Sequence, residues 1–177
     1  YCRDLQISIN TSPCQYFHQE SNITSWLNRL LEINVSARSI LLEVTENLLM
    51  KADEEVSKKL FQFRQAGVGI ALDDFGTGYS SISYLKKFPT DFIKIDKSFV
   101  KTMTDVSNDK VLCEAIIIMA KKLGIKVVAE GIETQEQFEI LKAMNCDYGQ
   151  GYYIARPMGK VDFESLLKAT STVRSAS

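Results

Sequence analysis

The sequence predicts an α/β domain in which short strands and amphipathic helices alternate around a parallel sheet or barrel. Runs rich in β-branched residues are separated by helical stretches, which is the order that βα units produce. The 177 residues, with 45% apolar and 24% charged side chains, are enough for one well-filled core. We therefore expect one domain. Each predicted strand also ends in a polar side chain that a purely structural strand does not need.

About six strands are predicted, and each is a short run bounded by turn or helix signals. In chain order they span residues 5–10 (LQISIN), 40–45 (ILLEVT), 68–73 (VGIALD), 92–96 (FIKID), 126–130 (KVVAE) and 147–152 (DYGQGY).

Helices between the strands have recognisable ends. Asp53 is a suitable N-cap for a helix that stops at Gly67, and a long helix spans about 108–123. Thr134, with Gln137 three residues later, forms the pattern of a capping box. In an earlier stretch Trp26, Leu27, Leu30 and Leu31 have helical spacing and are expected in the core. The polar segment 170–177 is expected to be a flexible tail.

The composition indicates which kinds of partner the protein can bind and in which cellular compartment it works. The net charge of -1 and pI near 5.9 argue against binding to a nucleic-acid duplex, although a bound cation would still allow a small anionic ligand. Four cysteines without zinc-like spacing indicate buried free thiols and a reducing, cytoplasmic location. The apolar run near 115–120 is too short to cross a membrane. Because the chain opens with Tyr1, we expect it to be a piece of a longer polypeptide.

The polar residues at the strand ends predict a metal site. They are Asn10, Glu43, Asp73, Asp74, Lys94, Glu130 and Gln150. In a βα barrel the carboxyl ends of all strands form one face, where active sites lie. Four carboxylates gathered there repel one another unless cations neutralise them. Oxygen donors without His or Cys suit Mg²⁺ or Mn²⁺ better than zinc.

A pair of cations at this face would be suited to phosphodiester chemistry. Asp73 is placed to bridge two ions, which can hold the attacking and leaving oxygens and acidify a water molecule. Lys94 would orient that water or offset charge on the phosphate. Asp74 points to the opposite face of a regular strand, but a turn at the strand end lets both aspartates reach one site.

Each of these residues also has a structural interpretation. An isolated Asp-Asp pair is commonly a turn or helix cap, and Glu43 could simply pair with Lys94. Asn10, Gln150 and Glu133 could be solvated hydrogen-bonding residues, whereas Glu46 and Asp96 could brace helix starts.

One string is highly specific for a family. The run from Asp73 to Ser81 (DDFGTGYSS) resembles the metal-binding strand end and following loop of EAL domains. The segments SIN, EVTE, KID, VAEGIE and QGY follow the family order along nearly the whole chain. The resemblance implies a TIM-like (β/α)8 barrel that hydrolyses cyclic di-GMP to linear pGpG with Mg²⁺ or Mn²⁺.

The resemblance also implies roles for matched positions. Metal ligands would be Asn10, Glu43, Asp73, Asp74 and Glu130, and Lys94 would position the nucleophilic water. Supporting or substrate-side residues would be Glu133, Gln150, Asp96, Glu46, Thr77, Gly78, Tyr79, Arg156 and Pro157. Glu46 would anchor the loop that begins at Phe75.

The family's Glu-Ala-Leu signature should precede Tyr1, so we expect an N-terminally incomplete EAL domain over 1–169 that lacks the first two strands. Alone it would be weakly active or inactive. The alternative function is a receptor or regulatory domain that binds cyclic di-GMP without cutting it. Family members also lead us to expect a homodimer fused to upstream sensory or diguanylate cyclase domains.

Overall fold

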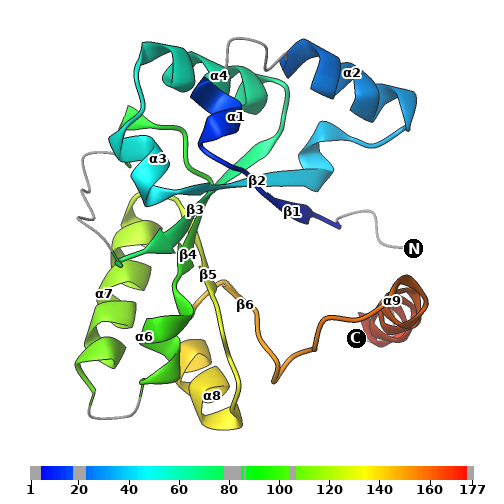
Figure 1. The fold of residues 1–177 in the computed structure, drawn as a ribbon. Helices are drawn as coiled ribbons and strands as arrows, with labels where there is room; N and C mark the ends of the chain where they lie inside the picture. Colours follow the sequence, from blue (N-terminus) through cyan, green and yellow to red (C-terminus); the bar gives the residue numbers. More distant parts are fainter. Residues whose placement is uncertain (1–4, 18–22, 78–84, 86, 104–106, 175–177) are drawn as a thin grey trace.

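A computed structural model describes residues 5–17, 23–77, 85, 87–103 and 107–174 (Figure 1). Six parallel strands form one sheet in chain order, so each βα unit adds its strand beside the previous one. The strands are β1 (Ile7–Asn10), β2 (Ile40–Thr45), β3 (Gly69–Phe75), β4 (Phe92–Ile95), β5 (Lys126–Ala129) and β6 (Tyr148–Gly149). All six predicted strands are therefore confirmed, with shifts of a few residues at their ends.

The helices of the described residues lie between and after the strands, and several begin after a capping side chain. They are α1 (Cys14–Phe17), α2 (Ile23–Glu32), α3 (Glu46–Met50), α4 (Glu54–Gln65), α6 (Lys97–Lys101), α7 (Asn108–Lys122), α8 (Gln135–Ala143) and α9 (Lys160–Arg174), with a 3-10 turn η1 (Ala37–Ser39). Asp53 accepts a hydrogen bond from Val56 N at 2.9 Å, and Thr134 and Gln137 form both bonds of the capping box. Helix α9 continues to Arg174, so helical structure extends past Thr170.

One face of the sheet packs against the helices and forms the main hydrophobic core with them. Alternate residues of the central strands, such as Val44, Ile70, Leu72, Ile93 and Val127, are at most 2% exposed. Because side chains alternate across a strand, the residues between them must point to the opposite, inner face. That inner face carries the acids and the lysine of the predicted site.

A smaller cluster lies under α2. Trp26, Leu27 and Leu30 pack beside buried Ile40 and Leu42, as predicted. The prediction that Leu31 is also in the core is wrong, since it is 72% exposed. The inward stripe of α2 ends at the preceding position, and one residue further turns the side chain by about 100° around the helix.

Over the described residues the sheet is open rather than closed on itself. Its edge strands are β1 and β6, which do not pair with each other, and all four residues of β1 are exposed. Figure 1 shows the helices α3, α4 and α7 along one side of the sheet, whereas α9 lies apart from them, on the side where β1 begins. The described chain is thus part of a barrel, as the six predicted strands imply.

Two further expectations concern thiols and membranes. Cys113 is fully buried, as predicted for a core thiol, but Cys14 in the first turn of α1 is exposed and corrects that prediction. Within the described segments, no helix combines the length and apolarity needed to span a bilayer.

Candidate active site

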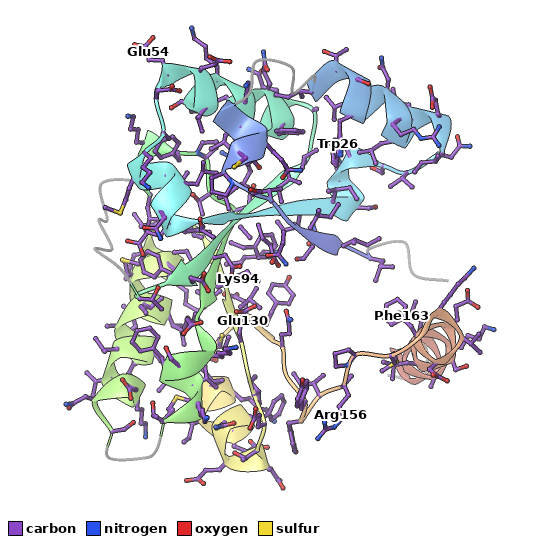
Figure 2. The ribbon with its side chains drawn as sticks, viewed as in Figure 1. Trp26, Glu54, Lys94, Glu130, Arg156 and Phe163 are labelled. Atoms are coloured by element: carbon purple, nitrogen blue, oxygen red, sulfur yellow. The ribbon has the colours of Figure 1, made fainter. Side chains whose placement is uncertain are left out.

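Three carboxylates converge on Lys94 at the carboxyl end of the sheet. The Nζ atom lies 2.8 Å from Glu43 Oε1 on β2, 3.0 Å from Asp73 Oδ1 on β3 and 2.7 Å from Glu130 Oε1 just after β5. Figure 2 shows Lys94 and Glu130 directed toward each other from neighbouring strands. The four side chains are between 5 and 18% exposed, so their charges meet where little water screens them.

A β-bulge lies at the two aspartates. Leu72 pairs with Ile93 and Phe75 pairs with Ile95, so Asp73 and Asp74 together face the single residue Lys94. The extra residue is absorbed at Asp74, whose φ of 55° is left-handed. Asp73 points to the inner face because it follows core-facing Leu72 in the alternation of the strand, whereas the bulge leaves Asp74 exposed beside it. The bulge replaces the simple turn that the sequence led us to expect.

The electrostatics of the cluster are dominated by burial and by the lysine. Burial acts to lower the pKa of Lys94, but hydrogen bonds to Glu130 and Glu43 and the contact with Asp73 outweigh it and raise the pKa above its ordinary value. Burial raises the pKa of Glu130, and the Lys94 hydrogen bond only partly opposes this. Burial, followed by the charges of Asp73 and Asp96, also raises the pKa of Asp74.

Asn10 lies beside this cluster on the edge strand. It is the register partner of Glu43, so both side chains emerge on the inner face. The next residue, Thr11, binds the Glu43 carbonyl oxygen twice, from its N–H at 3.1 Å and its Oγ1 at 2.7 Å. The buried Tyr16 hydroxyl donates to that same Oγ1 at 3.0 Å. Neither of these two hydroxyl groups was predicted to belong to the site, although Thr11 directly follows a predicted ligand.

The segments after β5 and β6 are held together by close backbone contacts. Ile132 N donates to Gln150 O at 3.1 Å, while Gln150 N donates to Ala129 O at 2.8 Å. A Cβ atom on Gly151 would lie 2.1 Å from Ile132 O, so only glycine fits there. Gln150 therefore follows directly on the strand end, whereas Glu133 is exposed and leads into the cap of α8.

The predicted substrate-side residues lie farther from the lysine. Gln150, Arg156 and Pro157 line a pocket of about 340 Å³, and the Arg156 guanidinium stacks 4.6 Å over the Tyr152 ring. In Figure 2 Arg156 is well separated from Lys94 and Glu130.

The remaining predicted residues brace the elements around the site. Glu46 is 5% exposed and begins α3, while Asp96 caps α6 by accepting from Ser98 N at 2.9 Å. Thr77 bonds back to the Asp74 carbonyl oxygen, with its Oγ1 at 2.9 Å. Gly78 and Tyr79 lie outside the described residues.

The carboxylate oxygens of Glu43, Asp73 and Glu130 are ligands that suit a hard cation, but in this structure they surround the Lys94 ammonium instead. Three carboxylates around one ammonium leave two formal negative charges in excess. Asp73 Oδ1 is buried and lies 3.0 Å from Nζ, the longest of the three contacts. Over the described ranges, no three His, Cys, Asp or Glu side chains are positioned to hold a metal ion as they stand. Some rearrangement would have to accompany metal binding.

A parallel sheet with acids, an amide and a lysine gathered at the carboxyl ends of its strands has the arrangement of an α/β-barrel active site. The match to known proteins is more specific. Residues 2–157 match the EAL domain family, and the chain belongs to that family.

Relatives and solved structures agree with this assignment. The chain is 39% identical over 155 residues to the bifunctional diguanylate cyclase/cyclic di-GMP phosphodiesterase MucR of Pseudomonas aeruginosa, covering 88% of this chain and 22% of that protein. It resembles the structure of the PaMucR phosphodiesterase in complex with c-di-GMP at a TM-score of 0.83 and 37% identity, covering 89% of this chain and 64% of that one.

A second structural neighbour contains a metal. The manganese and cyclic di-GMP complex of BlrP1 from Klebsiella pneumoniae has a TM-score of 0.77 and 32% identity, covering 85% of this chain and 38% of that one. The chain spans about a fifth of the length of the curated relatives it matches. Known EAL relatives thus include cyclic di-GMP phosphodiesterases and metal complexes.

Proposed function

We propose that the protein hydrolyses cyclic di-GMP to linear pGpG with two divalent cations, Mg²⁺ or Mn²⁺. The observation that carries this proposal is the convergence of Glu43, Asp73 and Glu130 on Lys94. The family membership and the cyclic di-GMP complexes of its relatives support the choice of substrate.

Five residues would hold the cations, and they are Asn10, Glu43, Asp73, Asp74 and Glu130. Bound cations would supply Lewis acidity, which offsets charge on the phosphodiester and acidifies water. In the overall reaction water adds to one phosphorus, one P–O ester bond breaks and the released hydroxyl takes a proton.

Lys94 would act as a hydrogen-bond donor in this reaction. Its ammonium is held on a central strand and is almost buried, so it can orient a water molecule or a phosphate oxygen without reorganising the backbone. Gln150, Glu133 and Asp96 would support the site, and Glu46 and Thr77 would support its loop. Arg156 and Pro157, in the pocket beyond Gln150, would contact the nucleotide.

The test is incubation of the protein with cyclic di-GMP and Mn²⁺, followed by chromatographic detection of pGpG. We expect product that EDTA abolishes and that Glu130→Gln lowers by at least about a hundredfold, since such carboxylate roles in catalysis carry effects of this size. Glu54→Gln is the matched control, because Glu54 is exposed on α4 and lies far from Lys94 in Figure 2. Absence of pGpG above the metal-free control would reject hydrolysis.

A receptor function is the second candidate, favoured by the lysine-filled arrangement of the carboxylates. Calorimetric binding of cyclic di-GMP without turnover would support it. We further propose that the protein is a homodimer in the cytoplasm and that sensory or diguanylate cyclase domains accompany it, as the bifunctional relative suggests. Light scattering on the protein measures the first of these.

A further inference from the structure

The cluster of Glu43, Asp73 and Glu130 already surrounds a cation, which is the ammonium of Lys94. An ammonium has three N–H donors, and three carboxylate oxygens from three different chain segments lie within 3.0 Å of it. The nitrogen therefore sits where the three acids converge. A hard cation would compete for the same three oxygens, but it binds oxygen at about 2.0 to 2.6 Å, so the acids would have to move closer together.

We infer that Lys94 is the resident counter-cation of this cluster and that a divalent cation competes with its ammonium for the same oxygens. The inference rests on the metal site of the proposed function and goes beyond it, because it gives Lys94 a role before substrate binds. Lys94 would hold the acids in place without metal and would release at least one of them when metal enters.

The need for such a counter-cation follows from burial. Glu43 is 5% exposed and Asp73 and Glu130 are 13% and 18% exposed, so water compensates their charges poorly. Removing one partner of a buried ion pair leaves an uncompensated charge and is strongly destabilising. Without Lys94 the metal-free acids would repel one another across adjoining strands.

The side chain is suited to being displaced. Lysine carries its charge on a flexible four-carbon stem, so the ammonium can move while β4 stays fixed between β3 and β5. The contact to Asp73 Oδ1 is the longest of the three, at 3.0 Å. We expect that oxygen to be released first.

The test compares Lys94→Met with Lys126→Met in thermal unfolding and in Mn²⁺ titration, without nucleotide. Lys126 is on the same face of the next strand, but it lies over the rings of Phe92 and Tyr148 rather than between acids. In EDTA, Lys94→Met should lower the Tm by about 6 to 20 °C, and saturating Mn²⁺ should restore most of this loss. Its Mn²⁺ affinity should rise at least about tenfold, since a competing charge is gone. Lys126→Met should change the Tm in EDTA and the Mn²⁺ affinity much less than Lys94→Met does.

A second measurement uses the unmodified protein and does not depend on the folding of a variant. The side-chain ammonium signal of Lys94 in nitrogen-15 NMR should be observable in EDTA and should move or vanish on saturation with Mg²⁺, while that of Lys126 stays unchanged.

The outcomes separate this inference from the proposed function. Equal Mn²⁺ affinity in Lys94→Met and the parent, or a Lys94 signal unchanged at saturating Mg²⁺, overturns the competition even if hydrolysis is observed. Tighter binding in the variant with no pGpG from the parent keeps the competition and rejects hydrolysis. No metal binding by either protein overturns both.

Discussion

Gly151 offers a sharp test of how the strand ends are assembled. A Cβ atom at this position would lie 2.1 Å from Ile132 O and 2.3 Å from Ile132 N, which are backbone atoms that cannot turn aside. In Gly151→Ala the two segments must separate, and this breaks the bonds from Ile132 N to Gln150 O and from Tyr153 N to Ile132 O. Each lost bond that strands a buried group costs about 1 to 3 kcal/mol. For the two bonds we therefore expect a loss of about 2 to 6 kcal/mol in the free energy of unfolding.

Two other glycines serve as matched controls. Gly159 has no atom within 4 Å of a built Cβ and no positive φ, so Gly159→Ala should stay within about 0.5 kcal/mol of the parent. Gly124 has equally open space but a φ of +72°, so Gly124→Ala should cost about 1 kcal/mol from left-handed strain alone.

The assay is urea unfolding followed by circular dichroism, with the m-value checked for each variant. The expected order of stability is Gly159→Ala, then Gly124→Ala, then Gly151→Ala. If Gly151→Ala unfolds at the same urea concentration as Gly159→Ala, the close approach of Gly151 to Ile132 is not part of the native fold and the reasoning fails.

Two further predictions concern a hydrogen bond at the start of β3 and a buried thiol. The Asp91 carboxylate accepts a hydrogen bond from Ile70 N at 3.0 Å, so Asp91→Ala should lower the free energy of unfolding by about 1 to 3 kcal/mol in the same urea assay. A change below about 0.5 kcal/mol would show that this hydrogen bond does not stabilise the strand. Burial raises the pKa of Cys113 to about 12, so its thiolate is scarce at pH 8, and iodoacetamide should modify exposed Cys14 at least about a hundredfold faster by mass spectrometry. Equal rates at the two cysteines would contradict the burial of Cys113.

Much of the fold could be predicted from local signals. The six strands, the Asp53 cap and the Thr134 capping box depend on residue types within a few positions of one another, and the structure confirms them. The error at Leu31 arose because helical periodicity identifies a stripe but not where packing against the sheet ends.

The site was partly predictable for a similar reason. Parallel strands bring their carboxyl ends to one edge, so Glu43, Asp73 and Glu130 could be expected together from their positions in the chain alone. The sequence could not decide whether Lys94 pairs with Glu43 or is free to orient a water molecule, because an ion pair depends on distances between strands.

The sequence by itself determined the strand–helix order, the family and the acids that meet, because these follow from short-range patterns and motif identity. Only the tertiary structure decided that Lys94 lies among three carboxylates, that a bulge keeps Asp74 out of the core and that Thr11 fixes the Glu43 backbone. These features depend on register and side-chain direction between segments that are distant in the chain, and no local pattern encodes them.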